Sequence, residues 1–384
     1  MGAVTAESDS SEEISADEVR AALRDYFADG SGLDEVRRNR DHPHAVTGGV
    51  DRAGWRRLAQ QVGLTSMTAP VSWGGLGLGV PYAVAAVEEC GAALYPGPVR
   101  AATLLARMLG GIEPDDVAPP VRAGLEDALA GTAIVGASDP GDGSAVPEFR
   151  VGGVTGRIGA CTHGDVAEVI VTPVQTADGP AIAAVAVSAG GSVERSAVPT
   201  IDLATPLADV TVVDVPAIVL VAPGNMVGLQ RFRNAQMLLL AAEQVGLAQG
   251  CLKQMVEYAS VREQFGVRIG TYQAISHRCA RTAVSIAAAR ALVAAAAEEI
   301  DRGNDTAATQ FTLLARAESA DAQAAASDAL IQVSGGIGFT WEHDAHLYFR
   351  RARATGALGG IPARLRDAAV RAGCLDLLLS EARS

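Results

Sequence analysis

Apolar side chains recur at helical spacing over much of the first 110 residues. Ser15 and Glu18 form a capping box that marks the start of the first helix, because each side chain can bond to the other's backbone N–H. Further helices are expected at three places: from near Asp51, over Pro81 to Leu94, and over Pro98 to Leu109. The pattern predicts an N-terminal α-helical domain over residues 15–128, after an acidic, serine-rich tail (1–14) that we expect to be disordered.

The pattern changes from about Thr132 to short runs rich in β-branched residues. These runs show no helical period and are separated by Gly, Pro and Asp: Ala133–Val135, Val169–Val171, Ile182–Val185 and Val210–Val213. Such spacing is typical of a small β-barrel or sandwich. We therefore predict a central β domain over residues 129–224.

Helical patterns return after Gly224 and continue to the C-terminus. They are interrupted at four places: Gly266–Gly270, Arg302–Asp305, Gly335–Gly338 and Gly356–Pro362. The breaks leave four or five helices, enough for a four-helix-type bundle over residues 225–384. The predicted fold class is thus α+β and multidomain, with a β domain inserted between two helical ones.

The composition indicates which kinds of molecule this protein can bind. Hydrophobic residues make up 49% of the chain and charged residues only 20%, which favours burial of extra surface against other subunits. A net charge of −13 argues against nucleic acid, which needs a basic surface. We expect a cytoplasmic protein, because the sequence shows no secretory signal and no membrane span. No metal site is expected, since the cysteines lack metal-ligand or C-x-x-C spacing: Cys90, Cys161, Cys251, Cys279 and Cys374.

Several short motifs occur in a fixed order along the chain. Two long helical patterns are joined by Arg262–Gly266 (REQFG), and Gln273 follows seven residues later. The other motifs are PVSWGGLG at Pro70–Gly77, Ser138-Asp139-Pro140 followed by Gly143-Ser144, QVSGGIGF at Gln332–Phe339, and the arginine-rich Tyr348–Arg353. Together they resemble the P-E-x-x-G-G-x-G, T-E-P, R-x-x-F-G and Q-x-x-G-G-x-G-F segments of the acyl-CoA dehydrogenase family. The resemblance covers nearly the whole chain and implies that family's fold.

The resemblance also implies FAD as the cofactor. In the family, the arginine turn and the glycine pair reach the ADP half of a flavin bound by a neighbouring subunit. A guanidinium suits a pyrophosphate, and glycine allows close backbone approach. The positions that match these motifs are Arg262, Phe265, Gln273, Gln332, Gly335 and Gly336. The structural alternative is a helix-turn salt bridge for Arg262 and a helix C-cap for the glycines.

In the β domain, the resemblance assigns Ser138 and Thr162 to the edge of the isoalloxazine ring. The family's W-x-T position falls at Ala160-Cys161-Thr162, so the stacking tryptophan is missing. The two hydroxyls are candidates for flavin contact, with plain barrel packing as the alternative. His163 is interpreted as a turn residue rather than an acid or base.

The family's catalytic base is missing from both positions where the resemblance places it. Dehydrogenation of an acyl-CoA needs a carboxylate to take the α-proton while hydride leaves the β-carbon for the flavin. Here Gly359 stands in place of the usual Glu, and Gln236 stands at the other location that the family uses. Glu243, seven residues beyond Gln236 on the same helical face, is a candidate for a relocated base, with a buried, paired residue as the alternative.

Three interpretations follow. In the first, the chain is one subunit of an α2β2 acyl-CoA dehydrogenase, and a second dehydrogenase-like subunit supplies the glutamate. The resemblance to subunits of actinobacterial heterotetramers that act on sterol-derived CoA thioesters favours this one. In the second, the chain forms a homo-oligomeric flavoenzyme with a relocated base. In the third, the fold serves flavin-dependent oxygenation or a structural role. The resemblance further implies an acyl-CoA substrate and electron-transfer flavoprotein as electron acceptor.

Overall fold

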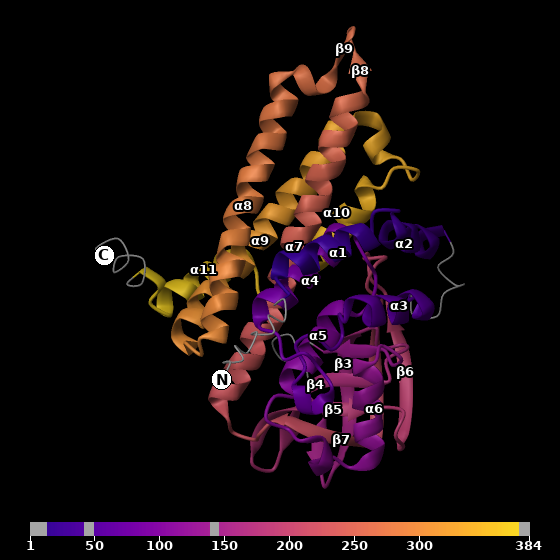
Figure 1. Ribbon diagram of the computed structural model, residues 1–384, viewed down its shortest axis with the longest axis vertical. Helices are drawn as coiled ribbons and strands as arrows, with labels where there is room; N and C mark the ends of the chain where they lie inside the picture. The colour runs from indigo at the N-terminus through magenta and orange to yellow at the C-terminus, as the bar shows by residue number, and fades with distance from the viewer. Residues whose placement is uncertain (1–13, 42–49, 139–145, 376–384) are drawn as a thin grey trace, which may run out of the picture.

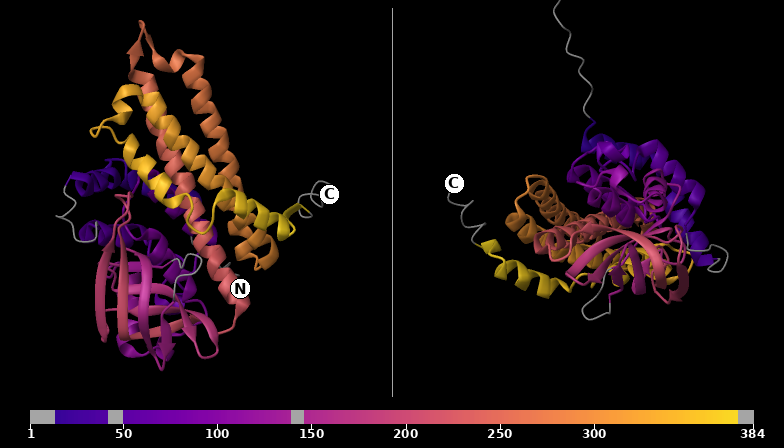
Figure 2. Two further views of the ribbon diagram at one scale, coloured as in Figure 1. Left: turned by 180° about the vertical axis from the view of Figure 1, so that it is seen from behind. Right: turned by 90° about the horizontal axis from the view of Figure 1, so that it is seen from below.

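The computed structural model describes residues 14–41, 50–138 and 146–375. A β-barrel flanked by short helices forms one end of the molecule, and a bundle of long helices extends away from it (Figures 1 and 2). This order of helices, strands and helices along the chain confirms the predicted fold class. Most of the predicted N-terminal tail, residues 1–13, lies outside the described ranges.

The N-terminal helices are α1 (Ala16–Tyr26), α2 (Ser31–Asp41), α3 (Arg52–Val62), α4 (Val80–Ala92), α5 (Val99–Met108) and α6 (Pro119–Leu129). Both bonds of the predicted capping box are present at the start of α1, and Asp51 caps α3. The sequence did not predict α2 or α6. In α2 the buried residues are Gly32, Glu35, Val36 and Asn39, so no apolar repeat marks the helix.

The strands are β1 (Val135–Ala137), β2 (Glu148–Arg150), β3 (Gly153–Thr162), β4 (Val169–Thr176), β5 (Gly179–Ala186), β6 (Ser192–Val198) and β7 (Leu207–Val221). They close into a barrel, because β3 pairs with β7, β7 with β5 and β5 with β4, while β1 and β2 each bridge β4 and β3. Ile170 points to the barrel core, whereas its neighbours Val169 and Val171 pack in the core shared with the helices. Thus one face of the barrel wall is covered by the helical part of the chain.

The C-terminal helices are α7 (Met226–Val261), α8 (Gln273–Asp301), α9 (Asp305–Ser334), α10 (Ala345–Thr355) and α11 (Pro362–Arg371). Each predicted break separates two of them, and a hairpin of β8 (Glu263–Gln264) and β9 (Val267–Arg268) joins α7 to α8. Helix α4 crosses α7 at close range. A Cβ on Gly91 would lie 2.4 Å from the carbonyl oxygen of Glu243, and one on Gly246 would lie 1.9 Å from that of Glu88. Only glycine allows this crossing, which locks the N-terminal helices to the bundle.

In the ranges that the structure covers, no helix combines the length and the apolar character that a membrane span requires. Within the same ranges, no group of three His, Cys, Asp or Glu side chains is placed to hold a metal ion.

A buried cluster of ion pairs connects the three parts of the chain. Arg351 of α10 is only 4% exposed and contacts both Glu243 of α7 and Asp202 of the β6–β7 connection, the latter at 2.5 Å. Arg100 of α5 approaches the other Glu243 oxygen at 2.7 Å. Burial favours the neutral form of Glu243, but the two guanidiniums outweigh it and hold the pKa of Glu243 below its usual range. The cluster therefore stays charged and holds the helices and the barrel together.

Replacing Arg351 with methionine should lower the free energy of unfolding by about 3–5 kcal/mol, because two buried carboxylates lose their partner. The matched control is Arg353→Met in the same helix, whose ion pair with Asp328 is roughly half exposed and should contribute at most about 1 kcal/mol. Denaturant unfolding of both variants measures the difference. Equal effects of the two substitutions would contradict the role given to Arg351.

Candidate functional site

The two positions at which the family carries its base lie beside each other. A Cβ on Gly359 would lie 3.6 Å from Cγ of Met237, the residue after Gln236 on α7. Gln236 is half-buried, and its Nε2 donates to the backbone oxygen of Ser138 at 3.4 Å. The structure thus brings together three predicted positions from α7, the α10–α11 turn and the barrel. Neither Gln236 nor Gly359 offers a group that accepts a proton at neutral pH.

The turn that carries Gly359 is fixed by Arg316 of α9, a residue that sequence reasoning missed. Its guanidinium is fully buried and donates to the carbonyl oxygens of Thr355 at 3.0 Å, Gly356 at 3.1 Å and Leu358 at 2.6 Å. Three charge-assisted bonds to one turn leave it little freedom. A lone arginine on the buried face of an alanine-rich helix is the sequence signal that could have identified it.

Glu243, the candidate for a relocated base, lies two turns along α7 from Gln236. Its two oxygens face Arg351 and Arg100, as described above. A carboxylate held between two guanidiniums takes up a proton less readily than a free one. The structure therefore gives Glu243 the contacts of the buried, paired residue that the sequence left as the alternative.

The polar groups of the barrel that the resemblance assigns to the isoalloxazine ring are engaged within the barrel. Ser138 Oγ donates to the carbonyl of Gly159 at 3.0 Å. Thr162 Oγ1 donates to the carbonyl of Ala137 at 3.1 Å and accepts from the N–H of the same residue at 3.2 Å. The residues that follow Ser138 in the T-E-P-like motif, 139–145, lie outside the described ranges. In this conformation the described hydroxyls do not fit a role as free donors to a flavin ring.

His163 is buried at the turn after β3, as the sequence interpretation placed it. Its Nε2 lies 2.8 Å from the backbone oxygen of Pro96. Burial lowers the pKa of His163 to about 4, so the imidazole is neutral at pH 7. It therefore carries no proton to donate as an imidazolium.

The residues predicted to contact the ADP half of a flavin are exposed, in contrast to the barrel hydroxyls. Arg262 directly follows α7, is exposed, and has no acidic partner within ion-pair distance in the described ranges. Its carbonyl accepts from Ile269 N–H at 2.8 Å, which shapes the turn. Phe265 is 95% exposed at the tip, and Gln273 is the exposed first residue of α8. This turn offers an available guanidinium and an available amide.

The glycine motif lies open after the end of α9. Gly335 has a φ of +64°, and a Cβ on it or on Gly336 would meet no atom within 4 Å. Gln332 is exposed beside them. The rings of Tyr258 and His343, 6.3 Å apart, connect the segment after this motif to the last turn of α7. An accessible backbone of this kind fits close approach by a phosphate or ribose, so the ADP-half residues suit FAD while the ring-half hydroxyls do not.

The two groups of predicted residues are far apart within one chain. Arg262, the residue that follows α7, lies 26 positions after Gln236, which corresponds to about 39 Å along the helix axis. Figure 1 shows the α7–α8 turn at the end of the bundle remote from the barrel. One flavin beside Gln236 is therefore out of reach of Arg262 from the same chain.

Thr162→Val should lower the free energy of unfolding by about 1–3 kcal/mol, because both backbone groups of Ala137 lose a partner. The matched control is Thr155→Val on the same strand, whose hydroxyl bonds to Asp214 are exposed, with an effect below about 1 kcal/mol. Urea denaturation of the chain alone, and flavin absorbance after co-expression with a dehydrogenase-like partner, are the measurements. Loss of flavin without loss of stability would show instead that Thr162 serves the cofactor.

The chain resembles known proteins in sequence. A family model, "Acyl-CoA dehydrogenase, C-terminal domain", matches residues 229–373. The acyl-CoA dehydrogenase IpdE2 of Mycolicibacterium smegmatis is 32% identical over 317 residues, 82% of this chain and 86% of that protein.

Two solved structures share the fold. A Tcur3481–Tcur3483 steroid ACAD variant has a TM-score of 0.78 at 22% identity, covering 96% of this chain and 99% of that chain. The ChsE4–ChsE5 complex from Mycobacterium tuberculosis has a TM-score of 0.76 at 24% identity, covering 94% and 97%. Members of the family of IpdE2 use FAD and are oxidoreductases that act on CH–CH groups. The extent and identity of the match to IpdE2 show that the chain belongs to the acyl-CoA dehydrogenase family.

Proposed function

We propose that this chain is one subunit of a heteromeric acyl-CoA dehydrogenase that takes part in α,β-dehydrogenation of a CoA thioester. It completes the ADP half of a flavin site whose ring half, and whose catalytic carboxylate, belong to a second dehydrogenase-like subunit. One observation carries the proposal. The ADP-half residues around Arg262 are exposed and available, whereas both base positions hold residues that cannot accept a proton, Gln236 and Gly359.

FAD, when bound, supplies the hydride acceptor for this reaction. The contribution of this chain is to hold and orient it. The Arg262 guanidinium is suited to pair with a pyrophosphate oxygen, and the amides of Gln273 and Gln332 are suited to donate to it or to the ribose. The Gly335–Gly336 backbone allows close approach.

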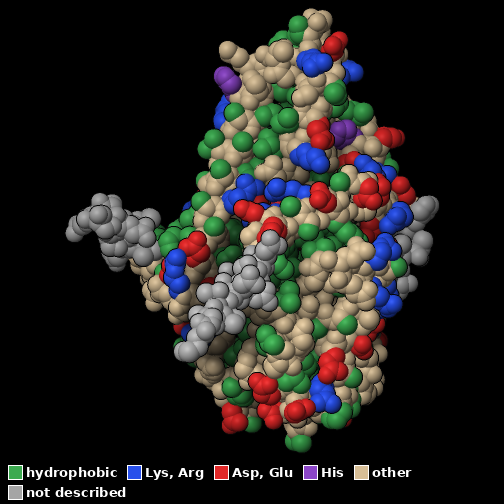
Figure 3. Space-filling model, viewed as in Figure 1, with side chains coloured by type: hydrophobic (Ala, Val, Ile, Leu, Met, Phe, Trp, Pro, Cys, Tyr) green, Lys and Arg blue, Asp and Glu red, His purple; other side chains and the backbone are tan. Residues whose placement is uncertain are grey.

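The surface around this cradle supports coverage by another subunit. Large apolar side chains are exposed at the α7–α8 turn and the glycine motif: Val261 at 74%, Phe265 at 95% and Phe339 at 81%. Val284, three turns along α8, is 70% exposed. Apolar side chains are visible over the upper part of the bundle in Figure 3. The first nine residues of α8, 273–281, include no buried residue. Apolar groups gathered beside a binding motif are typical of a protein interface.

The related proteins suggest the kind of assembly and substrate. ChsE4 and ChsE5 form a complex, and the Tcur3481–Tcur3483 protein is a steroid ACAD. By analogy we propose an α2β2 assembly and a CoA thioester derived from sterol breakdown. We further propose electron-transfer flavoprotein as the electron acceptor.

Expression of the chain alone and together with a dehydrogenase-like partner tests the proposal. The chain alone should retain little flavin and should not be bleached by acyl-CoA, because it lacks the base. The co-expressed complex should be yellow and bleach on addition of the thioester. Yellow, active protein from the single chain would favour a homo-oligomer with a base such as Glu243. Oxidation of NAD(P)H with oxygen, without bleaching by acyl-CoA, would favour oxygenase chemistry. Equal dehydrogenase activity of the partner with and without this chain would favour a structural role.

Within that complex, Arg262→Gln should weaken FAD retention about 10- to 100-fold, the equivalent of about 1.5–3 kcal/mol for a lost charged hydrogen bond. Arg233→Gln is the matched control, because Arg233 is likewise exposed but lies near the other end of α7. Flavin release during dialysis, followed by fluorescence, measures both. Equal retention in the two variants would rule out a flavin role for Arg262.

A further inference from the structure

Helix α2 contacts the segment that follows the glycine motif. Residues 340–344, the connecting segment, join the motif (Gly335–Phe339) to α10. Arg37 of α2 forms a bidentate ion pair with Asp344 at the end of this segment: Nε lies 2.9 Å from Oδ1, and Nη2 lies 2.5 Å from Oδ2. Nη1 of Arg37 donates to Asp34 of the same helix at 2.5 Å, which orients the guanidinium. Two parallel charge-assisted bonds fix both the position and the direction of the Asp344 carboxylate.

Arg40, one turn further along α2, holds the other end of the connecting segment. Its Nη1 donates to the backbone oxygen of Trp341 at 2.8 Å, and its guanidinium lies 5.8 Å from the centre of the Trp341 ring. Only 10% of the Arg40 side chain is exposed, so water competes little for this bond. His346 of α10 stacks on the same ring at 4.8 Å. Trp341 is therefore held from α2 and from α10 together.

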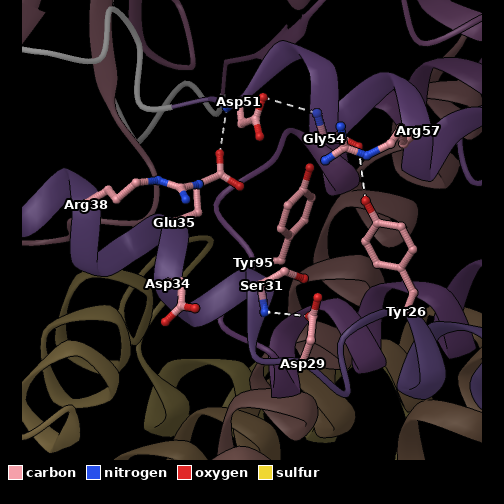
Figure 4. A pocket seen from close by; sticks show the side chains of 10 residues that line it. All are labelled: Tyr26, Asp29, Ser31, Asp34, Glu35, Arg38, Asp51, Gly54, Arg57 and Tyr95. Carbon is pink, nitrogen blue, oxygen red and sulfur yellow. Dashed lines mark hydrogen bonds between the residues drawn. The ribbon is translucent and has the colours of Figure 1, made fainter.

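The side of α2 away from these arginines is anchored to the rest of the N-terminal helices and to the barrel. Glu35 accepts from Asp51 N–H at the start of α3, at 2.6 Å (Figure 4). Asn39 donates to the carbonyl of Leu203 in the β6–β7 connection at 3.4 Å. Because a helix turns by about 100° per residue, positions 35 and 39 lie on the other side of α2 from positions 37 and 40. Helix α2 thus links the connecting segment to α3 and the barrel.

The glycine motif depends on what holds its two ends. Gly338 packs against α9, where a Cβ on it would lie 2.8 Å from the carbonyl oxygen of Ile331. A Cβ on Gly335 or Gly336 would instead meet no atom within 4 Å, and Phe339 is largely exposed. Open glycine backbone has wide conformational freedom. The path of the motif is therefore set by α9 before it and by the connecting segment after it.

We propose that Arg37 and Arg40 are positioning residues for the flavin site: they hold the connecting segment so that Gly335 and Gly336 keep the geometry that receives the ADP half of FAD. This inference rests on the proposed function, because it gives α2 a role in that same site. Neither arginine has to touch the cofactor. Loss of either one frees an end of the connecting segment, and ordering that end again on binding would weaken the affinity for FAD.

Hydrogen exchange of the full chain, followed by mass spectrometry, tests the positioning without any flavin. The amide of Thr340 donates to Ile337 and the amide of Leu347 donates to Asp344, each at 2.9 Å. These two amides report whether the connecting segment and its junction with α10 are held. Arg37→Gln and Arg40→Gln should each speed their exchange about three- to tenfold.

The matched control for this measurement is Arg24→Gln. Arg24 forms the same bidentate pair with Glu89, at 3.1 and 2.7 Å, but it joins α1 to α4. Exchange of the two amides in this variant should equal that in the natural chain. Unchanged exchange in either α2 variant would overturn the role given to that arginine. Equal acceleration in Arg24→Gln would overturn the inference as well, because it would reveal a general loosening of the fold.

FAD retention in the co-expressed complex tests the consequence for the cofactor. The Arg37→Gln and Arg40→Gln complexes should lose FAD about three- to tenfold faster during dialysis than the natural complex, whereas Arg24→Gln should retain it normally. Asp344→Asn should act like Arg37→Gln. The double variant should lose FAD no faster than either single one, because Arg37 acts through Asp344. Normal retention in the α2 variants, or additive losses in the double variant, would overturn the positioning role.

Arg262→Gln, measured beside them, separates this inference from the proposed function. Loss of FAD in Arg262→Gln with normal retention in both α2 variants would overturn the positioning role alone. Normal retention in all three variants would overturn the flavin role of this chain and the positioning role with it. Faster loss in all three, with Arg24→Gln unchanged, is the result that we expect.

Discussion

A single buried guanidinium, that of Arg351, is the contact on which the arrangement of the chain depends most. It pairs at once with Glu243 in the long helix α7 and with Asp202 beside the barrel. Removing charges from water is costly, so the cluster is stable only when all partners are in place. The geometry in which helices and barrel meet is thereby fixed two turns of α7 away from Gln236.

The same constraint limits the chemistry of this chain. The candidate for a relocated base, Glu243, is held by Arg351 and Arg100 and serves the architecture. Arg316 holds the turn that carries Gly359 by three backbone carbonyls. The interior here is ordered around arginines rather than around a free acid, which is consistent with a chain that supports a neighbour's chemistry.

The sequence predicted the features that depend on local pattern. The capping box of Ser15 and Glu18, the breaks between the long helices and the central β domain were confirmed, because each follows from short-range spacing. The sequence left a barrel and a sandwich open, since the β3–β7 pairing that closes the barrel is long-range. Helix α2 was missed because its buried face includes Gly32, Glu35 and Asn39 instead of an apolar repeat. The pair of Arg351 and Asp202, 149 residues apart, could not be predicted, since only tertiary packing brings them together. For the site, motif order singled out Arg262 and Gly335, which the structure places on exposed turns, but it could not show that the hydroxyls of Ser138 and Thr162 are used within the barrel. Their roles toward flavin stay predictions.

We propose that this chain completes a flavin site for a partner and does not carry a complete one of its own. The most direct measurement is the amount of FAD released from the purified complex, determined by absorbance against the concentrations of the two chains. We expect one FAD for each pair of unlike chains. The ADP-half residues of this chain and the ring-half residues of its partner form one complete site, whereas the reverse combination lacks a ring half. Two FAD molecules for each pair would contradict this proposal.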